Sequence, residues 1–146
     1  MSMARSEILE RMSQHQIELL RDLYAQIPHW VRTGEFTMDF LAPEIEFDFT
    51  QASFEQGIVQ GLDAFRKTWF EFRDTFEEHS VEPREFIDAG PEHVIVVVRD
   101  GGRVKASESK IYNEFTHLWT FRDDVAIRWA AFTDKAQALK AAGISG

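Results

Sequence analysis

Residues 93–132 read HVIVVVRDGGRVKASESKIYNEFTHLWTFRDDVAIRWAAF, and this stretch decides the fold class. His93–Arg99 is apolar on both faces, which is typical of a strand with neighbours on either side. Lys110–Phe121 and Val125–Phe132 predict two further strands. Asp100-Gly101-Gly102 offers the positive φ of a tight hairpin, so we expect these strands to follow one another in an antiparallel sheet.

Helices are predicted mainly before this stretch. A long amphipathic helix opens the chain, with one apolar face made by Ile8, Met12, Leu19, Leu23 and Ile27. Pro28 should end or kink it, and Gly34 is a helix stop. A short helix is expected over Thr37–Leu41, and helical spacing returns over Leu62–Glu78.

The remaining segments complete an α+β order. Ile45–Thr50 alternates apolar and polar residues as a half-buried strand does, Ser53–Gly61 is expected to be a loop, and Val81–Asp88 is another strand. Asp134 should cap a final helix over Lys135–Ala142. We therefore expect a single domain over residues 1–146, with a disordered start at residues 1–6 and helices gathered on one face of a bent sheet.

Composition excludes several classes of function. The net charge is −9 and no stretch is basic, so we expect neither nucleic acid nor an anionic membrane as a partner. Cysteine is absent, which excludes disulfides and thiolate chemistry. No signal peptide or run of about 18 apolar residues occurs, so a cytoplasmic location is expected. The 13 Phe, 4 Trp and 2 Tyr supply either a thick core or a cavity for a flat organic molecule.

No metal or cofactor is expected. The histidines show no spacing that would place two ligands on one metal from a single element; they are His15, His29, His79, His93 and His117. Gly101-Gly102 is followed by no helix and no suitably placed lysine, so it is not a phosphate loop.

Several short stretches, in this order and spacing, carry a resemblance that spans nearly the whole chain: Phe40–Asp48, Gly61–Phe65, Phe86–Gly90, Val94–Val98, Leu118–Asp123 and Asp134–Gly143. They resemble the NTF2-like superfamily, and within it the SnoaL-like and ketosteroid-isomerase-like proteins. The resemblance implies a cone-shaped (cystatin-like) fold, in which a strongly curved mixed or antiparallel sheet wraps on N-terminal helices around a pocket. It also implies a homodimer and a small hydrophobic ligand. This fold hosts isomerases, cyclases, dehydratases and binding proteins, so it does not fix a function.

The same resemblance implies positions for catalytic groups. In the isomerases a carboxylate near the end of the first strand moves a proton, and a tyrosine and a protonated aspartic acid form the oxyanion hole. Carried onto this chain, the oxyanion acid falls at His117 and the base at Asp48 or Phe49, depending on where a gap is placed. The tyrosine falls near Ile27, one turn after Tyr24.

His117 is the first candidate catalytic residue. On a strand it shares a face with Phe115, Trp119 and Phe121. A titratable imidazole among aromatic rings could polarise a carbonyl group or shuttle a proton. A buried, structural histidine is the alternative.

Asp48 and Arg128 are the other catalytic candidates. Asp48 would be a base if the pocket lay on its side of the strand, and an ordinary solvated residue otherwise. Arg128 alternates with Ala130 and Phe132, a trio that the resemblance places on the cavity wall. There Arg128 could orient Asp48 or hold an anionic ligand. The candidate ligand-binding residues are Tyr24, Trp30, Trp69, Trp119, Phe121 and Phe132.

Two hypotheses of different classes follow. The first is a cofactor-free enzyme of the cyclase, isomerase or dehydratase type, acting on a hydrophobic carbonyl compound with His117 as oxyanion stabiliser and Asp48 as base. The second is a non-catalytic pocket protein or dimeric interaction module. The position of the Asp48 carboxylate relative to the His117 ring separates them.

Overall fold

The computed structural model describes residues 4–35, 39–52, 57–107 and 109–144. The helices are α1 (Arg5–Thr33), α2 (Leu62–Arg73) and α3 (Lys135–Ala141), with a short 3-10 turn, η1, at Thr50–Ala52. The strands are β1 (Leu41–Asp48), β2 (Ile58–Gln60), β3 (Phe76–Asp88), β4 (His93–Val104), β5 (Lys110–Arg122) and β6 (Val125–Phe132).

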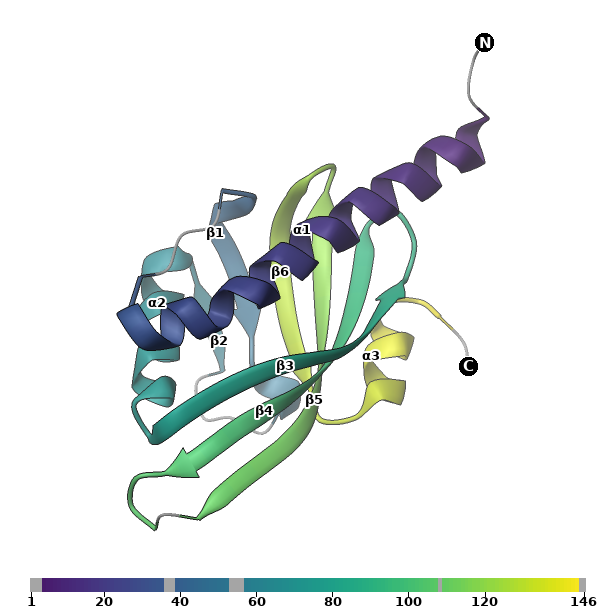
Figure 1. The fold of residues 1–146 in the computed structure, drawn as a ribbon. Coiled ribbons are helices and arrows are strands. Elements are labelled where there is room, and N and C mark those ends of the chain that lie inside the picture. Colours follow the sequence, from purple (N-terminus) through teal and green to yellow (C-terminus); the bar gives the residue numbers. More distant parts are fainter. Residues whose placement is uncertain (1–3, 36–38, 53–56, 108, 145–146) are drawn as a thin grey trace.

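The six strands form one open, mixed sheet in the order β2-β1-β6-β5-β4-β3. β1 and β6 are parallel, and every other neighbouring pair is antiparallel. In Figure 1 the sheet is strongly twisted, α1 crosses one face of it, and α2 lies at one end of that helix. The expected α+β class with a curved, mixed sheet is confirmed. The expectation that all helices gather on one face is wrong, because α3 packs on the face opposite α1.

Each face of the sheet has its own apolar cluster. The inner cluster packs α1 against residues such as Ile45, Phe47, Val96 and Trp119. The outer cluster packs α3 against the opposite face and consists of Ile95, Leu118, Ala130, Phe132 and Ala138. Because both faces of the central strands are covered, these strands are apolar on both sides.

Helix α1 follows its buried stripe, which includes Leu20, Ile27 and Trp30 at helical spacing. It ends at Gly34, whose φ of 76° and N–H bond to the Trp30 carbonyl confirm the predicted helix stop. Pro28 does not end the helix, because α1 continues to Thr33. Pro28 lies on the exposed side, and the packing of the opposite side holds the helical path.

Several predicted boundaries shift. β1 already begins at Leu41, the last residue of the expected short helix, whose residues 37 and 38 lie outside the described part. β2 occupies the end of the expected loop. α2 stops at Arg73 and β3 begins at Phe76, so the helix predicted over Leu62–Glu78 is too long. At the start of the chain, α1 already includes Arg5 and Ser6.

The hairpin predicted at Asp100-Gly101-Gly102 is also wrong, since β4 runs through these residues to Val104. A Cβ atom at Gly101 would overlap the backbone carbonyl of Ile111 on β5, and one at Gly102 would overlap that of Glu78 on β3. The glycines therefore allow β4 to pass closely between its two neighbours.

We predict that Gly101→Ala lowers the free energy of unfolding by about 3 kcal/mol or prevents folding, because the new methyl group meets backbone that cannot rotate away. Gly90→Ala is the matched control: a Cβ there meets nothing within 4 Å, although φ is +102°. Urea denaturation of both variants measures the difference. A Gly101→Ala protein no less stable than Gly90→Ala would contradict this explanation.

Candidate functional site

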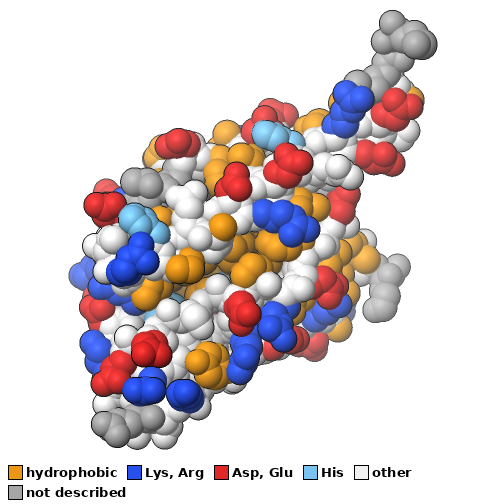
Figure 2. All heavy atoms as spheres, in the orientation of Figure 1, with side chains coloured by type: hydrophobic (Ala, Val, Ile, Leu, Met, Phe, Trp, Pro, Cys, Tyr) orange, Lys and Arg blue, Asp and Glu red, His pale blue; other side chains and the backbone are white. Residues whose placement is uncertain are grey.

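A cavity of about 100 Å³ lies between the inner face of the sheet and helices α1 and α2. Aromatic and aliphatic side chains form most of its wall, including Phe47, Phe49, Phe65, Trp69, Phe115 and Trp129. The polar groups of the wall belong to Tyr24, Thr68, Asp100 and His117, together with the tryptophan indoles. Figure 2 shows hydrophobic side chains gathered along the seam between α1 and β3, on the face seen there.

The strand pattern explains which side chains reach this cavity. Alternation along β5 turns Phe115, His117 and Trp119 inward, as expected from the sequence. On β6 the inward residues are Trp129 and Ala131. The His117 ring lies against Trp129 in an edge-to-face arrangement, with 4.8 Å between ring centroids.

A buried hydrogen-bond chain joins α1 to β5 inside the cavity. The Trp119 indole N–H donates to the Tyr24 hydroxyl oxygen at 3.0 Å. The same hydroxyl lies 2.6 Å from Nδ1 of His117. Since the hydroxyl already accepts from Trp119 and must place its own hydrogen, we assign it as the donor to an unprotonated Nδ1.

Burial keeps both partners of this pair neutral. It lowers the pKa of His117 from 6.5 to about 3, since the imidazolium would lose its hydration. Burial is also the largest cause of a raised pKa at Tyr24, where the charge of Asp100 acts in the same direction. Hydrogen bonds from the indoles of Trp119 and Trp129 oppose the rise but do not cancel it. His117 is therefore a neutral imidazole with its proton on Nε2.

Tyr24 lies one helical turn before Ile27, the position at which the resemblance implied the tyrosine of the oxyanion hole. The resemblance implied a tyrosine near Ile27, whereas the structure brings Tyr24 into contact with His117. Tyr24, Ile27 and Trp30 lie at steps of three on the buried stripe of α1, and all three line the cavity. Helical spacing was the available signal, because residues three apart share a face.

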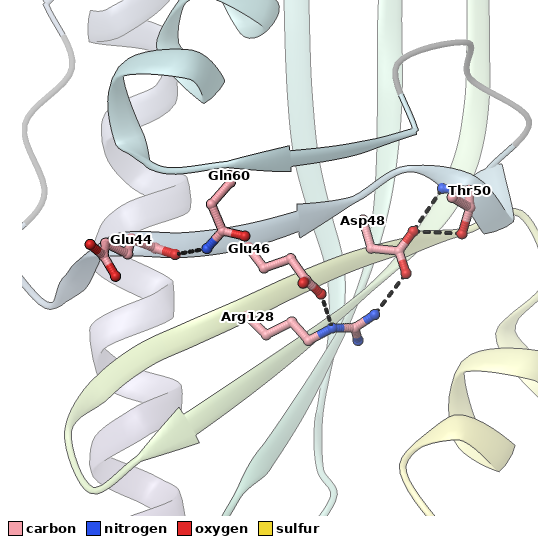
Figure 3. Close-up of polar contacts among 6 residues, drawn as sticks. All are labelled: Glu44, Glu46, Asp48, Thr50, Gln60 and Arg128. Atoms are coloured by element: carbon pink, nitrogen blue, oxygen red, sulfur yellow. Dashed lines mark hydrogen bonds and ion pairs between the residues drawn. The ribbon is translucent and has the colours of Figure 1, made fainter.

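Asp48 lies elsewhere. The Asp48 carboxylate bonds the Arg128 guanidinium at 2.7 Å and accepts from the Thr50 backbone N–H at 2.9 Å and from the Thr50 hydroxyl. Glu46 takes a second nitrogen of Arg128 at 2.7 Å, so one arginine joins two carboxylates of β1 to β6 (Figure 3). None of these side chains belongs to the cavity wall, which takes Phe47 and Phe49 from this segment.

Burial opposes ionisation of Asp48, but the hydrogen bonds from Thr50 and the charge of Arg128 outweigh it and lower the pKa of the carboxyl group. Asp48 is thus a fixed carboxylate. Arg128 was expected either to orient Asp48 or to hold an anionic ligand. It bonds Asp48, but outside the cavity wall, on the other face of the sheet.

The expectation that Arg128, Ala130 and Phe132 line the cavity is wrong. Ala130 and Phe132 belong to the outer cluster beneath α3. The pairing of β6 with β5 shifts between Arg128 and Ala126, which leaves Ile127 as an extra residue in a bulge. The bulge precedes these three residues, so they still share one face of the strand, and that face is the outer one. The resemblance had implied the opposite face.

Of the residues predicted to contact a ligand, four line the cavity: Tyr24, Trp30, Trp69 and Trp119. Phe121 is buried in the inner cluster and stacks on Phe40 at 6.3 Å, and it is not part of the cavity wall. Phe132 lies on the other face of the sheet.

Asp100 is a wall residue that the sequence analysis did not select, because it was assigned to a turn. One oxygen of its carboxylate lies 2.7 Å from Nε2 of His79, a buried residue of β3. The alternating pattern of β4 could have indicated it, since Val96, Val98 and Asp100 fall on one face.

The described residues contain no group of three or more His, Cys, Asp or Glu side chains that could hold a metal ion. In the same part of the chain, no helix combines the length and the hydropathy needed to span a bilayer.

The neutral state of His117 predicts a pH-dependent stability. The unfolded chain binds a proton at this residue below about pH 6.5 and the folded protein does not until about pH 3, so stability falls as the pH falls through this window. The free energy of unfolding should drop by roughly 1 kcal/mol per pH unit more in the wild type than in His117→Phe. Urea denaturation between pH 6.5 and 4.5 measures both slopes. Parallel slopes would contradict the assignment.

Known structures share this fold. TerC, crystallised with polyporic acid, is 20% identical over 88% of this chain and 98% of its own, with a TM-score of 0.68. An NTF2-like protein of unknown function from Burkholderia pseudomallei is 18% identical over 86% of this chain and 95% of its own, with a TM-score of 0.67. SalBIII, described as an epoxide hydrolase/cyclase-like enzyme in pyran ring formation in the polyether salinomycin, is 12% identical over 82% and 90%, with a TM-score of 0.62.

These identities show a common fold and nothing further about function. No protein with a curated description matches the sequence. The family model of the SnoaL-like domain matches residues 30–130, which is well over half of the chain. It covers all or nearly all of β1 to β6 and α2, the elements that form the sheet and most of the cavity wall. The chain therefore belongs to the SnoaL-like domain family.

Proposed function

We propose that the cavity binds a small, mainly apolar carbonyl compound, and that His117 donates a hydrogen bond to its carbonyl oxygen. The observation that carries the proposal is the 2.6 Å contact between the Tyr24 hydroxyl and Nδ1 of His117. It leaves Nε2–H as the donor of the ring, and a donor inside an apolar cavity selects a ligand with an acceptor.

The surroundings and the neutral state of the His117 ring support its role as a hydrogen-bond donor to the ligand. Nε2 of His117 has no hydrogen-bond partner among the described residues. This nitrogen is also not completely buried, since the fully buried unpartnered atoms of the described residues belong to Gln16 and His79. A neutral N–H group that is oriented before the ligand arrives costs no reorganisation on binding. The pKa of about 3 keeps the ring in this state throughout the physiological range.

The wall supports a flat and compact ligand. Phe47 stacks on Phe65 with 3.8 Å between centroids, and Trp30 meets Trp69 edge to face at 6.4 Å, so rings surround the space from several elements. Cavities on the order of 150 Å³ are known to admit a single benzene ring. The cavity of about 100 Å³ is smaller than that, so it admits a molecule with one ring when side chains of the wall rotate. The relative TerC, crystallised with polyporic acid, is consistent with a small-molecule ligand.

We predict that His117→Phe weakens the binding of acetophenone about three- to tenfold, because it fills a similar space and removes one neutral hydrogen bond. Tyr24→Phe should weaken it less, since the donor remains but its tautomer is no longer fixed. Quenching of tryptophan fluorescence or NMR titration gives the dissociation constants. Asp48→Asn is the control on the other face of the sheet and should bind acetophenone as the wild type does.

Equal affinity for acetophenone in the wild type and His117→Phe would contradict the proposed role of His117. A loss of binding in Asp48→Asn, with the fold intact by circular dichroism, would move the site to the other face of the sheet.

An acid–base enzyme acting on such a compound is the second candidate. The fixed donor at His117 favours it, because the same group would stabilise the negative charge that forms on the carbonyl oxygen when an α-proton leaves. The base expected for this reaction, Asp48, lies outside the cavity wall, and for this reason we propose binding rather than turnover.

Deuterium exchange separates the two candidates. Acetophenone is incubated with the protein in D2O, and the loss of its methyl proton signal is followed by NMR. Binding alone leaves the exchange at the rate of protein-free buffer. Faster exchange that disappears in His117→Phe would establish the enzyme instead.

A further inference from the structure

We infer that Asp100, held in place by His79, is a second polar anchor of the cavity and selects ligands that carry a hydrogen-bond donor at the end away from the carbonyl group. The inference rests on the proposed function, because it places a second contact on the same ligand.

The two oxygens of the Asp100 carboxylate have different surroundings. One accepts a hydrogen bond from Nε2 of His79 at 2.7 Å. The other has no partner among the described residues, although the side chain is only 15% exposed and Asp100 belongs to the cavity wall. A carboxylate offers about four acceptor positions, so most of this capacity is not used by the described residues and is available to a ligand. The influence of its charge on Tyr24 is consistent with both side chains facing the same space.

His79 is the positioning residue. A carboxylate only accepts, so Nε2 of His79 must carry the proton that lies between them. The ring is fixed by aromatic neighbours, with Phe76 stacked at 5.1 Å and Phe72 edge to face at 5.3 Å. This support lowers the cost of keeping a carboxylate against an apolar wall, and it satisfies only one of the two oxygens.

The sheet register sets the spacing of the two anchors. His117 pairs with Val96 on β4, and Asp100 is four residues farther along the same strand on the same face. At about 3.3 Å per residue, the two backbone positions are about 13 Å apart along the strand. Phe115, which pairs with Val98, lies between them and provides an aromatic surface for the middle of a ligand.

The complementary ligand therefore has an acceptor for His117, an aromatic or alicyclic middle part, and a donor for Asp100. A hydroxyl or amino group at the far end meets the carboxylate. A methoxy group in that place brings an acceptor against an acceptor and is disfavoured.

Three para-substituted ketones of one series test this inference: acetophenone, 4'-aminoacetophenone and 4'-methoxyacetophenone. A hydrogen bond to a charged group should make the amino compound bind the wild type at least about tenfold more tightly than the methoxy compound. In Asp100→Asn, the side-chain oxygen can still accept from His79 while an amide N–H replaces the acceptor facing the cavity. The preference for the amino compound should then disappear or reverse.

The wild-type ratio decides the question even if Asp100→Asn fails to fold. Similar affinities for the amino and methoxy compounds in the wild type would overturn the inference. The same preference in wild type and Asp100→Asn would also overturn it and leave the His79–Asp100 pair as a structural link between β3 and β4. Failure of all three ketones to bind would instead refute the proposed function, and the inference with it.

Discussion

The hydroxyl group of Tyr24 is the interaction on which the cavity depends. It joins α1 to β5 across 93 positions of sequence, accepts from Trp119 and donates to His117. Three buried polar groups satisfy one another in this way, and removing the hydroxyl leaves the other two without partners at a cost of about 1–3 kcal/mol each. The same bond fixes the tautomer of His117. One contact thus sets the distance between helix and sheet and the chemical character of the cavity.

The sheet separates neutral from charged chemistry. Inside, burial holds the Tyr24–His117 pair uncharged. Outside, Arg128 bridges Glu46 and Asp48 across the parallel β1–β6 pair, where water solvates the network in part. Asp100 differs from this pair as the carboxylate on the cavity wall, and His79 is its hydrogen-bond partner. A ligand entering this space meets one neutral donor and one carboxylate, and the rest of its surface meets aromatic rings and aliphatic side chains.

The sequence predicted the fold well and the site in part. Apolar periodicity and the order of short family-like stretches identified the sheet, the long first helix and the inward face of His117 and Trp119. Three features were missed for physical reasons. β6 packs against the inner cluster on one face and against α3 on the other, so its apolar pattern does not tell which face lines the cavity. Gly101-Gly102 favours a turn locally, but close strand packing uses the same glycines. Contact between Tyr24 and His117 depends on how a helix lies on a sheet, which no single-chain pattern contains.

The most direct test of the central claim is the protonation state of His117 in the unliganded protein, read from the nitrogen-15 NMR signals of its ring between pH 5 and pH 8. The account predicts an unprotonated, hydrogen-bond-accepting Nδ1 and a protonated Nε2, with no titration in this range and a loss of the fixed tautomer in Tyr24→Phe. A ring that becomes charged near its ordinary pKa, or one that carries its proton on Nδ1, would contradict the account. The cavity would then present a different group to its ligand.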